Sequence, residues 1–430
     1  MNVLTKNIKA LNQLLFIFTF YLCILLFNIG GFFTSFYAVN LFYIIVPISI
    51  LIAFLVGRYS FFIPNSDFTK VFWGFIFVYL TVSIISFHIY SYDEKYPLVY
   101  NLRTFGYSII NVYIFYRLSL IFHMHRKFDL LLTLFGRICL LAMLLTAFFP
   151  YFNIVPLDFT KASDSLMTIA HSYNIRLTGF YLNPNLAGYV ANVSLVFAMT
   201  LLIFNKRFNI VAIVLFFLSI YISIRSFSKT AILVSLILSI VFFTFLFLKK
   251  QFWFSTVFKQ RRFVVFTTLA IGFILVYKSA TWYQSLDEGQ KQRIDQVLSI
   301  VSEVEINEKT TTHRSEIWEI GVKKIERSPV IGYGFGSFDH FEDVGQGIHN
   351  MYLKIFGEAG FFIGLYYLLI HVLLIIPLYY EKNSHIQFLI LGLMISTFIF
   401  NFSNHNAFIT PIISMVYGVL LSFSNQFHNE

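Results

Sequence analysis

Residues 71–87 read VFWGFIFVYLTVSIISF, and residues 232–248 read ILVSLILSIVFFTFLFL. Neither stretch contains a charged side chain, and neither alternates apolar and polar residues as the strands of a membrane β-barrel do. A helix needs ~20 mostly apolar residues to cross the hydrocarbon core of a bilayer. The two stretches therefore predict helices that span a membrane.

The rest of the chain has the same character. Of its 430 residues, 58% are hydrophobic, 20% are aromatic and only 12% are charged, whereas soluble domains carry about 25% charged residues. The mean hydropathy is +0.74. So little polar surface excludes a soluble enzyme, a disordered protein and, despite a formal net charge of +10, a nucleic-acid-binding module. The composition predicts an all-α polytopic integral membrane protein.

By the same length criterion we expect about twelve transmembrane helices. The first follows Lys6 and Lys9 but precedes no small-residue cleavage site, so we expect it to be retained rather than removed as a signal peptide. The expected spans are 12–32, 39–57, 71–90, 106–122, 130–150, 185–204, 209–224, 229–248, 263–279, 353–380, 386–402 and 407–425.

These spans divide the chain into five segments. Residues 1–150 hold helices 1–5, 151–184 form an extracytoplasmic loop, 185–279 hold helices 6–9, 280–352 form a large extracytoplasmic loop, and 353–430 hold helices 10–12. The large loop between helices 9 and 10 is polar and charged, which indicates surface helices in a small extramembrane subdomain.

The distribution of Lys and Arg predicts the orientation, because cytoplasmic loops carry an excess of these residues. With the N-terminus in the cytoplasm, fourteen fall in cytoplasmic segments and six in the short outside loops. The six are Lys95, Arg103, Lys161, Arg176, Arg225 and Lys229. We therefore expect both termini to be cytoplasmic and the functional site to lie outside.

Several of the outside cations are candidates for binding an anion. Arg225 and Lys229 lie in a short turn between two spans, where an ionisable group is costly and usually has a partner or ligand. The alternative is that both side chains extend to the lipid headgroups. Arg176 precedes Asn183-Pro184-Asn185, a helix-start pattern. The free backbone N–H groups at the start of this helix are suited to binding an anion. The alternative is that they belong to an ordinary capped turn.

The large loop contributes further candidates. His313 and Arg314 begin a helix whose Arg314, Trp318 and Val322 share one face, and we expect it to lie on the membrane surface with Trp318 at the interface.

After that helix, the alternating glycines of VIGYGFGSFDHF at 330–341 lack the Gly-Lys-Ser/Thr of a nucleotide-binding loop. His349 and Asn350 begin the tenth predicted helix, and Glu358 follows two turns later. A histidine at a helix start is more often a cap or structural donor than a catalyst. No Cys/His metal spacing is visible, so we predict no metal and no cofactor.

Four segments, in this order, resemble the O-antigen polymerase and O-antigen ligase superfamily. They span about 185 residues. The segments are RLTGFYLNPN at 176–185, RSFSKTA at 225–231, RSEIW at 314–318 with SPVIGYG at 328–334, and HNMYLKIFGEAG at 349–360. The N-terminal half matches only as a run of helices.

The resemblance implies a metal-independent glycosyltransferase of the bacterial inner membrane, acting in lipopolysaccharide and polysaccharide biosynthesis. The donor would be a glycan on undecaprenyl pyrophosphate, and the acceptor a sugar hydroxyl. By motif, Arg176, Arg225 and Arg314 would contact the pyrophosphate and His349 would be catalytic. Lys229 stands where the family often has Arg. The residues expected to support the site are Asn185, Asn350, Glu358 and His313.

The chemistry of these residue types agrees with that reaction. Arginines bind phosphate oxygens through two donors and keep their charge, and a histidine accepts a proton near neutral pH. We therefore expect Arg176, Arg225 and Arg314 to converge on one outer pocket, with His349 as the general base. His313 is its strongest rival, and Glu358 is next.

The segment that starts at His349-Asn350 and the Gly-x-Gly loop before it favour a polymerase. Two alternatives remain. A ligase would transfer the glycan to lipid A-core instead of a lipid-linked repeat unit. A flippase or transporter would also have about twelve helices, but transporters place charged sites near the midplane and often show related halves, which this sequence lacks. The expected partners are the lipid-linked repeat units, membrane lipid and a chain-length regulator in the membrane, and no nucleic acid.

Overall fold

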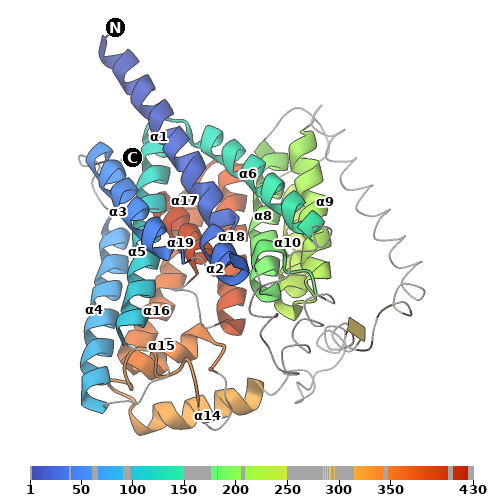
Figure 1. Cartoon of the computed structure of the whole chain (residues 1–430). Helices are drawn as coiled ribbons and strands as arrows, with labels where there is room; N and C mark the ends of the chain where they lie inside the picture. The colour runs from blue at the N-terminus through green and yellow to red at the C-terminus, as the bar shows by residue number, and fades with distance from the viewer. Residues whose placement is uncertain are drawn as a thin grey trace. The chain divides into compact units, whose positions relative to one another are not determined.

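The computed structural model describes residues 2–37, 40–60, 66–90, 98–149, 176–181, 183–204, 209–248, 314–341, 347–404 and 410–424, with a few single positions between 284 and 295 (Figure 1). Within these ranges the regular elements are helices. They are α1 (Asn2–Leu26), α2 (Ile29–Tyr37), α3 (Phe42–Tyr59), α4 (Asp67–Tyr90), α5 (Leu98–Met124), α6 (Phe128–Phe148), the 3₁₀ helix η3 (Gly179–Tyr181), α8 (Pro184–Phe204), α9 (Ile210–Arg225), α10 (Lys229–Leu248), α14 (Arg314–Arg327), α15 (Met351–Ala359), α16 (Phe361–Leu373), α17 (Ile376–Tyr380), α18 (Ser384–Ser403) and α19 (Pro411–Phe423).

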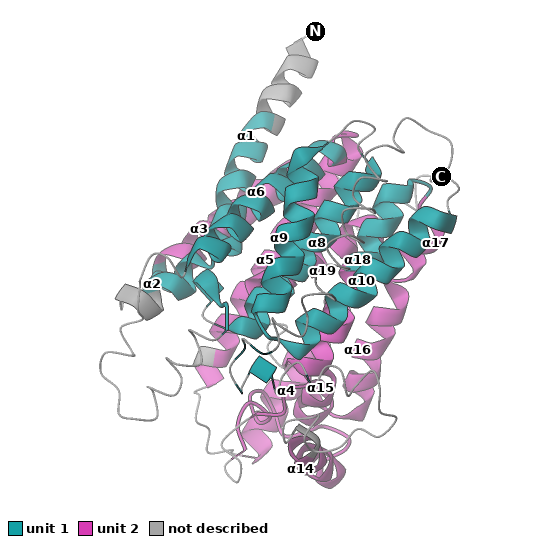
Figure 2. Cartoon of the chain, turned by 90° about the vertical axis from the view of Figure 1, so that its right-hand side faces the viewer, with its two compact units in different colours: residues 1–43, 129–305, 382–392 teal, residues 44–128, 306–381, 393–430 magenta. Residues whose placement is uncertain are grey.

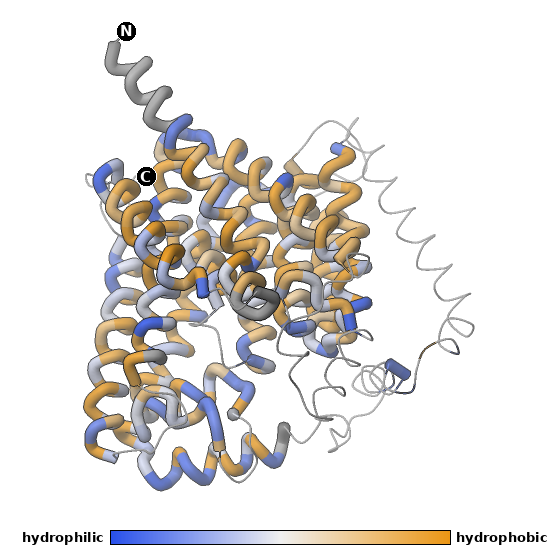
Figure 3. The backbone as a smooth tube through the Cα atoms, in the orientation of Figure 1, coloured by the Kyte–Doolittle hydropathy of each residue, from blue (hydrophilic) through white to orange (hydrophobic). Residues whose placement is uncertain are grey.

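The predicted class, a polytopic helical membrane protein, is confirmed. Eight segments of the described chain are helical, long and apolar enough to cross a membrane, and three shorter apolar helices accompany them. Figure 3 shows hydrophobic residues dominating the bundle helices, whereas α14 mixes hydrophilic and hydrophobic residues. The expected ninth span, 263–279, lies outside the described residues, so the number twelve stays a prediction.

Two of the predicted spans are divided in the structure. The span expected at 12–32 ends as α1 at Leu26, and α2 starts after Asn28, whose φ is 46°. The single helix expected over 353–380 is wrong, because the chain there forms α15, α16 and α17. Gly360 makes the first break with φ 85°, and a Cβ at this position would lie 1.9 Å from the Val330 carbonyl oxygen. Both the backbone angle and the available space therefore require glycine.

The described chain divides into two units, shown in teal and magenta in Figure 2. Unit 1 comprises residues 1–43, 129–305 and 382–392. Within it, α8 packs against α9 and α10. The Asn192 side chain of α8 joins the three helices: its amide donates to the Ala231 carbonyl at 3.1 Å and its oxygen accepts from Ser223 and Ser235. A buried amide that is satisfied in this way specifies one packing of the helices.

Unit 2 comprises residues 44–128, 306–381 and 393–430. Within it, α19 packs closely on α5, because a Cβ at Gly418 would lie only 2.6 Å from the Val112 carbonyl oxygen. The short helices α14 and α15 pack together and lie at the end of the unit where α4 ends (Figure 1). This polar end of unit 2 carries His349.

Candidate functional site

In unit 1, the turn between α9 and α10 presents Arg225 and Lys229 at its two ends. The turn itself is Ser226–Ser228, and its central residue, Phe227, has φ 46° and is 1% exposed. The Ser226 hydroxyl accepts from the Ser228 N–H at 3.3 Å, and the Ser228 hydroxyl accepts from the Ala231 N–H at 3.4 Å. A left-handed aromatic residue is uncommon and persists only where its surroundings hold it. The turn is therefore a constrained structure.

Arg176 is one of the groups that hold this turn. Its Nε donates to the Ser226 carbonyl at 3.0 Å, and its Nη2 donates to the Phe227 carbonyl at 3.4 Å and to Asn185 Oδ1 at 3.3 Å. The Leu177 N–H also donates to the Arg225 carbonyl at 2.9 Å. The structure thus brings Arg176, Asn185 and Arg225 together. Several N–H groups of the Arg176 guanidinium are hydrogen-bonded within the protein.

The start of α8 is an ordinary capped turn, the alternative left open above. Asn183 Oδ1 accepts from the N–H groups of Asn185 at 2.8 Å and Leu186 at 3.4 Å. Pro184, which has no N–H, occupies the first helical position. The first donors of this helix are therefore bonded to Asn183 rather than directed at an anion.

The guanidinium of Arg225, unlike that of Arg176, is not bonded to the described protein. Its side chain is half-buried, and among the described residues it makes no hydrogen bond and no ion pair. Lys229, four residues later, is half-buried as well. A half-buried arginine at a membrane boundary is costly without an anion to bind. Among the described cations of unit 1, Arg225 is therefore the one best suited to a ligand.

In unit 2, His349 lies directly before α15 in a clamped segment. Its neighbour Ile348 donates its N–H to the Phe338 carbonyl at 3.1 Å and accepts from the Trp318 indole at 3.0 Å. Its other neighbour, Asn350, caps the helix by accepting from the Leu353 N–H at 3.1 Å. His349 itself is half-buried with φ 45°, a conformation that histidine adopts more readily than most residues. The contacts of its two neighbours thus fix the backbone of His349.

Trp318 packs against the protein itself, and its expected position at a membrane interface stays a prediction. Its indole N–H bonds the Ile348 carbonyl, and its ring packs against a buried cluster between α14 and the loop before α15. The members of that cluster are Ile317, Phe338, Phe341 and Ile348. The predicted apolar face of α14 is present, and it packs against this cluster of the protein. Arg314 begins this helix, and neither its side chain nor the rival base His313 is among the described parts. The convergence of Arg314 with Arg176 and Arg225 therefore stays a prediction.

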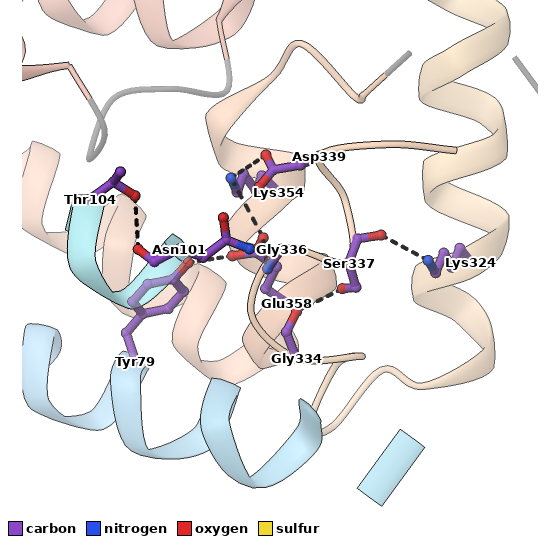
Figure 4. A network of polar contacts seen from close by, with 10 residues as sticks. All are labelled: Tyr79, Asn101, Thr104, Lys324, Gly334, Gly336, Ser337, Asp339, Lys354 and Glu358. Atoms are coloured by element: carbon purple, nitrogen blue, oxygen red, sulfur yellow. Dashed lines mark hydrogen bonds and ion pairs between the residues drawn. The ribbon is translucent and has the colours of Figure 1, made fainter. Parts of the chain in front are cut away.

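A buried polar network surrounds Glu358 in unit 2 (Figure 4). The Glu358 carboxylate is 0% exposed, and it accepts from the Tyr79 hydroxyl and, at 2.8 Å, from the Gly336 N–H. Lys354 approaches the same carboxylate at 3.6 Å and also pairs with Asp339. A carboxylate held by these donors and closed to solvent is poorly placed to take a proton from a substrate.

Burial is the main influence on the charges in this network. It raises the pKa of Glu358 to about 7, although the nearby Lys354 ammonium acts in the opposite direction. Burial lowers the pKa of Lys354, but the carboxylates of Asp339 and Glu358 outweigh it, so that this pKa is raised overall. Lys354 therefore stays protonated and neutralises part of the negative charge.

The sequence offered few signals for this network. Lys354 and Glu358 are four residues apart, which places both on one helix face. This spacing is the sequence feature that indicates their pairing. Nothing in the local sequence marks Tyr79 or Asp339 as partners of Glu358. Among the described residues, no three His, Cys, Asp or Glu side chains are grouped so that they would hold a metal ion.

The comparison with protein families agrees with the resemblance. The family model described as O-antigen ligase matches residues 213–368, which include the Arg225 turn, α14 and the segment from His349 to Glu358. No curated protein matches the chain. The match leaves out Arg176 and the whole of α4. The matched segment contains the arginine turn and the clamped histidine, and it supports the relationship of this membrane-spanning chain to the superfamily of O-antigen ligases and polymerases, whose members are membrane glycosyltransferase-like enzymes.

Proposed function

We propose that the protein is a surface-polysaccharide polymerase. It transfers a glycan from undecaprenyl pyrophosphate to a sugar hydroxyl of a second lipid-linked repeat unit on the outer leaflet. The observation that supports this most directly is Arg225, a half-buried guanidinium without a partner among the described residues, on a turn that Arg176 and two buried serines constrain. Such a cation suits a phosphate oxygen, which an arginine binds through two donors.

The residues then divide the chemistry between them. The acceptor hydroxyl gives its proton to a ring nitrogen of His349 while its oxygen attacks the anomeric carbon of the donor. The bond between that carbon and the pyrophosphate breaks, and the pyrophosphate leaves with the electron pair. Arg225 contacts this leaving group directly, Arg176 positions the Arg225 turn, and Arg314 and Lys229 are further contacts of the same anion.

A purified protein in lipid nanodiscs tests the function with a fluorescent lipid-linked repeat unit. A polymerase yields a ladder of products that differ by one repeat unit, without added lipid A-core. A single product that forms only when lipid A-core is added would assign ligase activity instead. If no new glycosidic bond forms and the lipid only crosses to the other leaflet, the protein is a flippase.

The proposed orientation places α14 outside the cell membrane and both termini in the cytoplasm. Glu319 on α14 and Lys382 between α17 and α18 are both exposed. In a variant without Cys23 and Cys139, a cysteine at Glu319 should react in whole cells with a thiol reagent that cannot cross the inner membrane. A cysteine at Lys382 should react only after permeabilisation. The reverse pattern would show that the chain is inserted the other way round.

A further inference from the structure

One face of α4 contacts the glycine-rich loop that precedes His349, although α4 lies outside the matched family segment. Tyr79 donates to Glu358, the Ser83 carbonyl accepts from the Phe335 N–H at 3.2 Å, and the Ser86 hydroxyl donates to the Ile331 carbonyl at 2.5 Å. The Tyr90 hydroxyl also bonds the Ser328 hydroxyl at 2.8 Å. The steps of four, three and four residues put these four residues of α4 on a single face, although Ser83 makes its contact through the backbone carbonyl. The outer end of α4 is therefore a docking surface for the loop.

The glycines of the loop allow this close approach. Gly334 has φ 94°, and a Cβ there would lie 2.4 Å from the backbone nitrogen of Phe87 on α4. Gly332 has φ 68°, and a Cβ there would lie 2.5 Å from the carbonyl carbon of Glu358 on α15. The loop thus lies so close to α4 and α15 that a side chain at Gly332 or Gly334 would clash with their backbones.

A chain of hydrogen bonds leads from this docking surface to His349. The Glu358 carboxylate, fixed by Tyr79, accepts from the Gly336 N–H, and two residues later the Phe338 carbonyl accepts from Ile348, the neighbour of His349. Lys324 of α14 donates to the Ser337 carbonyl at 2.9 Å between these two points. The loop therefore transmits the position of α4 to the backbone of His349 through contiguous contacts.

We propose that Tyr79 is a positioning residue for His349, acting through the Glu358 carboxylate and the loop at 332–341. This inference rests on the proposed role of His349 in glycan transfer. Tyr79 touches no reacting group. Its hydroxyl orients the buried carboxylate, the carboxylate holds the Gly336 N–H, and the loop holds the segment that ends in His349.

The test replaces Tyr79 by phenylalanine, which removes one hydroxyl and little else. Tyr366→Phe is the matched control, because the Tyr366 hydroxyl also bonds α4, at the Val71 carbonyl at 2.7 Å, but has no contact with the loop. Hydrogen exchange of the purified proteins in nanodiscs should show faster exchange at 332–350 in Tyr79→Phe and unchanged exchange there in Tyr366→Phe. Above the pKa of Glu358, where the carboxylate is charged, loss of a hydrogen bond to it corresponds to a change of about 10- to 100-fold in such an opening equilibrium.

Glycan transfer is the second measurement. In Tyr79→Phe we expect kcat to fall by about tenfold or more, the lower end of that range, while KM for the lipid-linked donor stays near the wild-type value. Glu358→Gln should act in the same direction. The double variant should be little worse than either single one, because residues that act through one contact are not additive.

The outcomes separate this inference from the proposed function. If the wild-type protein forms no glycosidic bond, the proposed function fails, and unchanged exchange at 332–350 in Tyr79→Phe would still refute the docking role. Faster exchange together with an unaltered kcat would overturn the positioning of His349. Equal losses of kcat in Tyr79→Phe and Tyr366→Phe would also overturn it, since they would indicate general destabilisation of α4.

Discussion

Replacing His349 by alanine should slow glycan transfer by ~10²–10⁴-fold, the usual contribution of a general base, while the protein still inserts and binds its donor. The imidazole is half-buried at the start of α15, and both of its neighbours in the chain are bonded to α14 or to the loop at 332–341. These contacts are made by the neighbours of His349 and not by its imidazole. The measurement is the rate of product formation per folded protein in nanodiscs.

The positive φ of His349 calls for a second variant. Alanine is disfavoured in this region of the backbone, so His349→Ala combines the loss of the imidazole with strain. Asparagine adopts the conformation readily, and His349→Asn should therefore avoid this backbone strain and lose as much activity as His349→Ala. His340→Ala and His313→Ala, which alter two other histidines of the outer loop, should be much milder. Near-normal transfer by His349→Asn would mean that the base is another group.

Replacing Arg225 by alanine should lower kcat/KM for the lipid-linked donor by about 10- to 100-fold, because a hydrogen bond between charged groups contributes about 1.5–3 kcal/mol. Arg225→Lys should also be impaired, since lysine keeps the charge but loses the planar pair of donors that matches a phosphate. Thermal stability should stay close to wild type, because the Arg225 guanidinium makes no hydrogen bond or ion pair with the described protein.

Arg176→Lys provides the contrast within the same turn. Arg176 makes three hydrogen bonds to Ser226, Phe227 and Asn185, so its replacement should lower both activity and thermal stability. Arg327→Lys, at the exposed end of α14, should change neither. If Arg225→Lys retained wild-type kcat/KM, or if it lost stability as Arg176→Lys does, the direct contact with the leaving group would be refuted.

Local features of this protein were accessible from the sequence. The class follows from long uncharged runs such as 232–248, because a bilayer offers no partners to the backbone and leaves the helix as the way for such a run to cross. The cap at Asn183 and Pro184, the short turn after Arg225 and the helix start at Asn350 were visible as well. Each of these depends on residues within about one turn of one another, so nearby side chains suffice to specify it.

The position at which a run of apolar residues divides into two helices depends on residues far away in the chain. The break at Gly360 has a weak signal, since a single glycine is tolerated inside helices. The break is required by the approach of the Val330 carbonyl, thirty positions earlier in the chain. The same reason applies to Trp318: its periodic face was predictable, but its contact with the buried cluster between α14 and the loop before α15 depends on the neighbours of α14.

The sequence by itself therefore determined the helical membrane class, the turns and the residue types suited to binding an anionic sugar donor. The tertiary structure alone decided which of them meet: Arg176 with the turn at Ser226, 50 residues away, and Tyr79 with Glu358, 279 residues away. The physical reason is that a hydrogen bond needs its two groups within about 3 Å of one another. Two groups that are 50 or 279 residues apart in the chain come this close only through the packing of whole helices. Many residues determine that packing, and no single motif does.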